Sequence, residues 1–373
     1  MITTTEQHRH IYEPDTVSPP GETLKETLDA LGMTQRELAK RTGRHQKTIS
    51  EIINAKATIT AETALQFEHV LGIPASFWTK REQRYQEFKE REKEREELAG
   101  WTHILKDFPV KAMAELGFVE RVRDKVEQLR ELLRFFGVAT PAQLLEQTSS
   151  PQAAFRKSTA FEASDEAVSA WLRAGEKAGR EMNCEPFDAS EFRQALDDIR
   201  AATAGPIDEF FETAVERASR AGVAVVLVPQ LSDSRVCGAT RWLAPQKALI
   251  QLSLRYKTDD HFFFTLFHEA GHVLLHGKSE AFLEVGNDEA TTDEKEEEAD
   301  KFSRDYLIPP ADYARFLQQT NLRYVSHSDI QAFAREIGVA PGVVVGRLQH
   351  DEHVPYRNFN KLKQRLPWAE AVE

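Results

Sequence analysis

One apolar stretch, residues 262–276, constrains the fold most, because it carries H-E-x-x-H within a helical rather than an alternating pattern. Residues four apart on a helix of about 3.6 residues per turn lie on one face. His268 and His272 can therefore reach a single metal ion. Zinc prefers imidazole and carboxylate ligands, and a catalytic zinc binds three protein side chains and one water. Glu269, next to the first histidine, is placed to take a proton from that water as the water attacks a carbonyl.

A third zinc ligand is expected from a second helix at residues 292–309, which is rich in acidic residues and ends at a Pro-Pro pair. Small and apolar positions such as Ala299 mark its buried face. Glu296 falls on this face and is the preferred third ligand, whereas Glu298 is the alternative. Asp300, one turn after Glu296, is expected to accept the free imidazole N–H of a histidine ligand. In the absence of a metal site, such an acidic run is an ordinary solvated helix face.

These two segments, in this order and at this spacing, resemble the ImmA/IrrE family of zinc metallopeptidases over roughly residues 210–350. The matching sequence is T-L-F-H-E-A-G-H from Thr265, followed by E-x-x-A-D-x-F-S-x-x-Y-L-I-P from Glu296. Ser303 replaces a usual alanine and Asp300 stands where asparagine is common, and neither change affects the metal ligands. The resemblance implies three zinc ligands and one general base, namely His268, His272 and Glu296 as ligands and Glu269 as the base.

Near the N-terminus, the sequence predicts a bundle of short helices that contains a helix-turn-helix. Thr34 can cap one helix, with Glu37 three residues later, and a further helix follows the glycine turn at residues 46–54. The segments T-Q-x-x-L-A, T-I-S and N-A-K match the lambda-repressor-like (XRE) family in order, and the residues up to Trp78 most resemble the HigA antitoxin branch. The alternative is a small helical bundle used only for dimerisation.

The predicted recognition helix presents polar residues to DNA. Gln46 and Lys47 at its start suit base edges in the major groove. The net charge of −12 argues against broad nucleic-acid affinity, but residues 22–62 hold seven Lys or Arg against six Asp or Glu. We expect a homodimer that binds a pseudo-palindromic operator. The remaining predicted DNA contacts, mostly to phosphates, are Gln35, Arg44, Thr48, Ser50 and Lys56.

Strand character appears only after residue 222. Three short runs, at residues 223–228, 236–242 and 248–252, are predicted to be strands. They precede the H-E-x-x-H helix and fit a zincin-like α+β domain. Residues 278–290 are expected to form an acidic loop. Residues 100–220 predict several amphipathic helices that carry no chemical motif.

The expected fold class is multidomain and mainly α with an α+β part. It comprises an N-terminal lambda-repressor-like helix-turn-helix bundle, a helical middle region and a C-terminal zincin-like α+β metallopeptidase domain. The expected domains are a flexible arm at 1–20, a helix-turn-helix domain at 21–79, a charged helical linker at 80–99, a helical scaffold at 100–220, a peptidase domain at 221–355 and a tail at 356–373.

The sequence also bears on the cellular location of the protein and on the use of its cysteines. No apolar run approaches the roughly 20 residues of a membrane span, so no membrane partner is expected. The N-terminus lacks a basic and then apolar signal sequence, which predicts a cytoplasmic protein. Cys184 and Cys237 are the two cysteines of the sequence and lie far apart in it, which argues against a disulfide scaffold and a thiolate zinc site.

Two functions fit these features. The first is a DNA-binding transcriptional regulator, similar to HigA antitoxins, that carries a zinc-dependent endopeptidase domain. This domain would hydrolyse a peptide bond of a repressor or of a toxin–antitoxin partner. The alternative is an antitoxin or repressor whose peptidase-like domain is catalytically silent and binds a partner toxin. Zinc content distinguishes the two, because the enzyme needs the metal.

Overall fold

The predicted fold class is confirmed by a computed structural model, which describes residues 17–149, 156–157, 164–231, 234–278, 281–285 and 294–366. Most of the expected arm, residues 1–16, and the end of the expected tail, residues 367–373, lie outside the described residues. The chain divides into two units, Met1–Trp101 and Thr102–Glu373.

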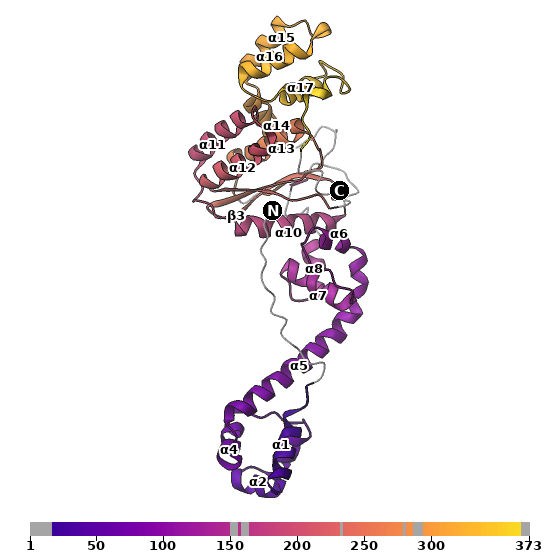
Figure 1. Cartoon of the computed structure of the whole chain (residues 1–373), viewed down its shortest axis with the longest axis vertical. Coiled ribbons are helices and arrows are strands. Elements are labelled where there is room, and N and C mark those ends of the chain that lie inside the picture. Colours follow the sequence, from indigo (N-terminus) through magenta and orange to yellow (C-terminus); the bar gives the residue numbers. More distant parts are fainter. Residues whose placement is uncertain are drawn as a thin grey trace. The chain divides into compact units, whose positions relative to one another are not determined.

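The N-terminal unit is a bundle of helices (Figure 1). Among the described residues, its core is formed by buried apolar side chains from each of these helices, including Leu24, Leu38, Ile49, Phe67 and Trp78. The helices are α1 (Pro20–Ala30), α2 (Gln35–Thr42), α3 (Gln46–Ile53), α4 (Ala61–Leu71) and α5 (Ala75–Trp101).

Helix α2 begins and ends at the residues that the sequence predicted. The Thr34 hydroxyl accepts the N–H of Glu37 at 3.1 Å and caps α2. Gly43 ends α2 with φ 71°, a left-handed conformation that favours glycine. The two signals set the ends of α2, the first helix of the helix-turn-helix, and both are local to this part of the sequence.

The first turns of α5 belong to the bundle, although the predicted linker begins at residue 80. The ring of Trp78 is fully buried and meets Phe67 edge-on, with 5.5 Å between centroids. The Glu82 carboxylate is buried and accepts the N–H of Ile59 at 2.9 Å. Farther along, α5 carries exposed ion pairs such as Arg91 with Glu87, 2.8 Å apart, as expected for a solvated charged helix.

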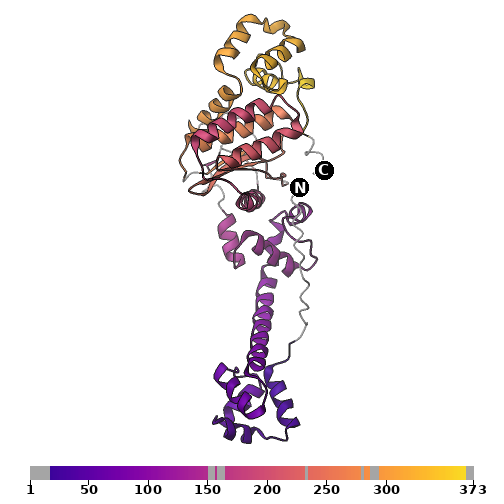
Figure 2. The ribbon, with the colours of Figure 1, turned by 60° about the vertical axis from the view of Figure 1, so that its left-hand side comes forward.

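The C-terminal unit is built around a five-stranded mixed sheet with the order β1-β5-β3-β4-β2 (Figure 2). Strands β3 and β4 pair antiparallel and β4 and β2 pair parallel. The predicted strand runs are confirmed with small differences at their ends. The strands are β1 (Arg156–Lys157), β2 (Val223–Leu227), β3 (Val236–Ala244), β4 (Lys247–Leu252) and β5 (Phe282–Val285).

Helices cover both faces of this sheet (Figure 1). Helix α10 (Asp165–Glu181) packs on one face. On the other face, α12 (Ile207–Arg220) lies against β2, and α13 (Asp259–Leu275) lies against β3 and β4. Next to these, α11 (Ala189–Ala202) packs on α12 and α14 (Glu294–Leu307) packs on α13. This places α13, with the H-E-x-x-H residues, between the sheet and α14.

The remaining elements of the unit either precede α10 or follow α14 in the sequence. The first group is η1 (Thr102–Lys106), α6 (Val110–Glu115), α7 (Lys125–Phe136) and α8 (Pro141–Thr148). The second group is α15 (Pro310–Gln319), η2 (Leu322–Tyr324), α16 (His327–Ile337), α17 (Pro341–His350) and η3 (Asn360–Leu362). Within the described parts of the chain, no helix is both long and apolar enough to cross a membrane.

The prediction of a loop at residues 278–290 is wrong at Phe282–Val285, which form strand β5. Val285 pairs with Val236 and Phe282 with Thr240, both antiparallel, so β5 extends the sheet beyond β3. The four-residue run is too short to show a strand period among its acidic neighbours. It becomes a strand through its hydrogen bonds to β3, which is about forty residues earlier in the chain.

Candidate metal centre

Helix α13 is buried along nearly its whole length, and this brings its histidines into the interior. His268 and His272 are each 2 % exposed, and Glu269 is fully buried. The close approach of α14 depends on Gly271, since an added Cβ there would lie 3.2 Å from both Ala299 Cα and Phe302 Cδ1. The glycine therefore lets the acidic helix lie directly against the histidines.

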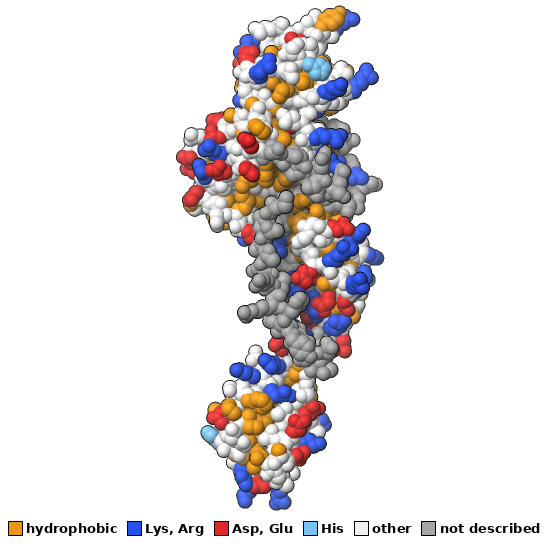
Figure 3. Space-filling view, viewed as in Figure 1, with side chains coloured by type: hydrophobic (Ala, Val, Ile, Leu, Met, Phe, Trp, Pro, Cys, Tyr) orange, Lys and Arg blue, Asp and Glu red, His pale blue; other side chains and the backbone are white. Residues whose placement is uncertain are grey.

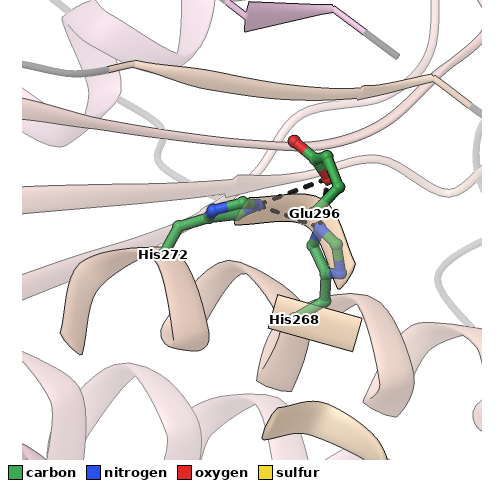
Figure 4. Close-up of side chains that lie close together, drawn as sticks. All are labelled: His268, His272 and Glu296. Atoms are coloured by element: carbon green, nitrogen blue, oxygen red, sulfur yellow. Dashed lines mark hydrogen bonds and ion pairs between the residues drawn. The ribbon is translucent and has the colours of Figure 1, made fainter. Parts of the chain in front are cut away.

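The side chains of His268, His272 and Glu296 point toward one another, as Figure 4 shows. The Nε2 atoms of the two histidines are 3.0 Å apart. Oε2 of Glu296 lies 3.1 Å from Nε2 of His268 and 3.5 Å from Nε2 of His272. Ligand atoms about 2.0–2.1 Å from one tetrahedral zinc ion lie roughly 3.3 Å apart. The three atoms therefore fit one zinc ion, with a fourth position left for water or substrate.

The electrostatics of Glu296 and His272 suit a divalent cation. Burial raises the pKa of Glu296, but hydrogen bonds from His268 and His272 outweigh it and lower this pKa to about 2. Burial lowers the pKa of His272 to about 4, which keeps this imidazole neutral. Burial also acts to lower the pKa of His268, but its hydrogen bonds to Asp300 and Glu296 raise it well above the usual value. An anionic carboxylate and a neutral imidazole are the forms that bind metal, so Glu296 and His272 already have these forms, whereas His268 would release a proton when a metal binds.

The other ring nitrogens of the two histidines also have partners. Nδ1 of His268 lies 2.9 Å from Oδ1 of Asp300, the contact that the sequence led us to expect. Nδ1 of His272 lies 2.9 Å from Nδ1 of His276. Glu298, the alternative ligand, is outside the group of three and places its carboxylate 3.1 Å from Nε2 of His276.

Glu269 lies on the side of α13 that faces β3. Both of its carboxylate oxygens are buried and have no hydrogen-bond partner among the described residues. The hydroxyl of Thr240 donates instead to the backbone carbonyl of Glu269, at 3.1 Å. Burial raises the pKa of Glu269 well above its usual value; His268 opposes this shift, and the carboxylate of Glu284 adds to it. A carboxylate with a raised pKa is a good proton acceptor near neutral pH.

Comparison with known families identifies both parts of the chain. Residues 24–78 match the helix-turn-helix family, and residues 237–349 match the family of the IrrE N-terminal-like domain. The chain joins a helix-turn-helix domain to an IrrE-like domain. The resemblance inferred from the sequence is thereby confirmed for both segments, and the second is a metallopeptidase-like domain.

Two solved structures resemble part of this chain. One, from Nostoc punctiforme, is described as an antidote protein of a plasmid maintenance system. It is 28 % identical, with a TM-score of 0.21, and the match covers 21 % of this chain and 88 % of that one. The other is a HigA-family addiction module antidote protein from Coxiella burnetii. It is also 28 % identical with a TM-score of 0.21, and the match covers 22 % and 92 % of the two chains. No curated protein matches this chain.

Glu284 in the IrrE-like domain is a further acidic residue near the three side chains that was not predicted from the sequence. Its Oε2 atom is buried and has no hydrogen-bond partner within the described part of the chain. Burial raises the pKa of this carboxylate; His268 opposes the shift, and Asp300 and Glu296 add to it. The residue was missed because it lies on β5, in the segment assigned to a loop.

The helix-turn-helix domain exposes most of the predicted DNA contacts. Gln46, Lys47 and Lys56 are exposed, and Gln35, Thr48 and Ser50 are partly exposed. Arg44 differs, because its Nε donates to Gln66 at 2.6 Å and its Nη2 lies 3.3 Å from Glu62. The side chain of Arg44 thus joins α4 to the turn before α3, which favours a structural role for this arginine.

Proposed function

We propose that this protein is a DNA-binding transcriptional regulator whose IrrE-like domain is a zinc endopeptidase. The observation that carries the proposal is the geometry of three side chains. Ligand atoms of His268, His272 and Glu296 lie 3.0 to 3.5 Å apart in a buried site. Glu269 follows the first histidine on the same helix, and its carboxylate has no hydrogen-bond partner among the described residues.

In this proposal, Nε2 of each histidine and Oε2 of Glu296 would hold the metal. Asp300 accepts the Nδ1 proton of His268 and so keeps its Nε2 lone pair directed at the ion. A zinc ion held there would act as a Lewis acid, which would polarise a peptide carbonyl and lower the pKa of bound water. Glu269 accepts a proton as water attacks the peptide carbonyl and then delivers it to the leaving amine nitrogen. The carboxylate of Glu269 is fully buried and has no competing hydrogen bond among the described residues. Both features favour its acceptance of a proton.

The substrate class proposed is a protein that acts with the DNA-binding function, namely a repressor or a toxin–antitoxin partner. Joining a DNA-binding domain to a peptidase-like domain in one chain supports this proposal, because an operator and a protein partner can then be addressed together. Cleavage of a repressor would lift repression at the bound operator.

We also propose that the helix-turn-helix domain acts as a homodimer on a pseudo-palindromic operator. The large apolar side chains that it exposes include Leu31, Leu65 and Phe77, which are 53 %, 51 % and 40 % exposed. Figure 3 shows hydrophobic side chains gathered on the visible face of this domain. Burying such side chains against a second copy would stabilise a dimer.

Zinc content of the full-length protein tests the enzymatic proposal. We expect about one zinc ion per chain in the wild type and almost none in His268→Ala or His272→Ala, because each variant removes one of three protein ligands. Candidate partners encoded beside the gene are then co-expressed with the wild type, and their fragments are identified by mass spectrometry. A wild type with little zinc that added zinc does not restore would favour the silent antitoxin instead.

A further inference from the structure

The two histidines of the metal centre differ in how the far side of each ring is held. Nδ1 of His268 meets a carboxylate directly, that of Asp300. Nδ1 of His272 meets another imidazole nitrogen, Nδ1 of His276, at 2.9 Å. His276 in turn places its Nε2 3.1 Å from Oε2 of Glu298. The second histidine is therefore connected to a carboxylate through one more ring.

The end of α13 and strand β5 together position the rings of His272 and His276. His276 is the residue that ends α13, and its extended backbone turns its ring back toward His272. The side chain of His276 is only 2 % exposed. On β5, the ring of Phe282 stacks on His272 with 3.9 Å between centroids and lies 5.0 Å from the ring of His276. Phe282 therefore keeps water away from the contact between the two imidazoles.

The positions of the protons follow from the direction of the rings. Nε2 of His272 faces His268 and Glu296, so a metal there requires its lone pair and its proton must be on Nδ1. That N–H can donate only if Nδ1 of His276 is unprotonated. The proton of a neutral His276 is then on Nε2, where it donates to Glu298. Each donor meets an acceptor with both imidazoles neutral.

We infer that His276 and Glu298 are positioning residues, which hold His272 in the tautomer that presents Nε2 to the metal. The inference rests on the proposed zinc site and concerns residues for which the family matches give no role. A carboxylate partner raises the basicity of a ligand imidazole and fixes its orientation. Here the carboxylate acts through His276, and Glu298 is itself 54 % exposed, so the effect of Glu298 is smaller than that of His276.

The test measures zinc affinity of the full-length protein by competition with a chromogenic chelator. His276→Phe keeps a ring against Phe282 but removes the acceptor, and it should weaken zinc binding by about 10–100-fold. His276→Asn places a side-chain oxygen near the position of Nδ1 and should recover most of the affinity. Thermal unfolding of the chelator-treated protein is measured in parallel. A positioning role lowers zinc affinity in His276→Phe while the melting temperature of the metal-free protein stays close to that of His276→Asn.

Glu298 gives a second and milder comparison that does not disturb the interior. Glu298→Ala should weaken zinc binding several-fold, which is less than the roughly 10–100-fold typical for direct partners of a ligand. Glu297→Ala, its exposed neighbour on α14, is the matched control and should bind zinc as the wild type does. If His276→Phe fails to fold, this pair of variants decides the question.

Two results would overturn the inference. One is a His276→Phe variant that binds zinc as tightly as the wild type, and the other is equal affinity of Glu298→Ala and Glu297→Ala. In both cases the wild type still binds zinc, so the proposed metal site stands while the positioning role fails. Failure of the wild type to bind zinc would instead remove the proposed function, and the inference with it.

Discussion

Gly238 and Glu269 share one small space in the IrrE-like domain, because a Cβ added to residue 238 would lie 2.4 Å from Oε1 of Glu269. The same Cβ would lie 2.8 Å from Cγ2 of Thr265. The carboxylate of Glu269, the proposed general base, therefore occupies space on β3 that a side chain at residue 238 would fill. The glycine acts through the space that it leaves free, since it has no side chain.

Gly238→Ala should displace the carboxylate of Glu269 while leaving the three ligand side chains in place. A displacement of about 1 Å at a catalytic group can cost on the order of 10²-fold in rate. We expect a loss of this size in the rate of partner cleavage, with unchanged zinc content. Gly100→Ala, on α5 with no atom within 4 Å of the added Cβ, is the control. A fully active Gly238→Ala would show that the position of Glu269 does not limit the reaction.

Glu269→Gln separates metal binding from catalysis. The amide cannot accept the proton of the attacking water, and loss of a general base typically costs about 10²–10⁴-fold in rate. Zinc should stay bound, because Glu269 is outside the group of three ligand side chains. The measurements are zinc stoichiometry and partner cleavage on the same preparation. Cleavage by Glu269→Gln at the wild-type rate would rule out the proposed mechanism.

Glu296→Ala and Glu298→Ala test which acidic residue of α14 binds the metal. Oε2 of Glu296 is 3.1 Å from Nε2 of His268, so Glu296→Ala should lose both zinc and activity. Glu298 reaches His276 instead, so Glu298→Ala should keep about one zinc ion per chain at saturating zinc, with weaker affinity. An empty site in Glu298→Ala together with a full site in Glu296→Ala would reverse the assignment.

A buried acid at the start of α13 predicts how the stability of the domain depends on pH. Asp259 is fully buried, and its Oδ2 has no hydrogen-bond partner in the described ranges. Burial, and next the charge of Asp260, raise the pKa of Asp259 to about 7. The folded protein therefore holds this proton more tightly than the unfolded chain, whose Asp has a pKa of about 3.9.

The protonated Asp259 side chain adds to the free energy of unfolding. This contribution is fully present below about pH 4 and is lost as pH rises toward 7, by an amount on the order of 4 kcal/mol or less. Asp259→Asn removes this titration and should flatten the pH dependence of the melting temperature over that range. Asp260→Asn should flatten it only in part, because it removes a charge that helps to raise the pKa of Asp259 and also breaks the ion pair of Asp260 with Lys363, 2.6 Å apart. Equal pH dependence in the wild type and Asp259→Asn would show that Asp259 is ionised throughout.

Sequence-specific DNA binding should depend on the start of α3. Both Gln46 and Lys47 are exposed there, so Gln46→Ala with Lys47→Ala should remove sequence preference and leave the fold intact. Lys56→Ala should weaken binding to all sequences and reduce the salt dependence by about one counterion. Gel-shift titrations on the protein's own promoter and on an unrelated duplex, at two salt concentrations, measure both effects. Undiminished preference in the double variant would place the recognition helix elsewhere.

The sequence by itself determined the features that depend on local geometry. The spacing of His268 and His272 sets them on one face of a helix, whatever surrounds that helix. Thr34 and Gly43 mark the ends of α2 because both signals act within a few residues of the chain. The β-branched run at 223–228 and the two short apolar runs after it likewise predicted β2, β3 and β4, since their composition is local.

Only the tertiary structure decided which distant atoms meet. The strand that carries Phe282 and Glu284 exists because its backbone pairs with β3, and no local pattern shows that pairing. The space at Gly238, the second ring at His276 and the contact of Glu298 with it depend on how α13, α14 and β5 pack together. Helical periodicity gives the direction of a side chain to within a face. A hydrogen bond of about 3 Å also requires the exact separation of two elements, and close packing sets that separation.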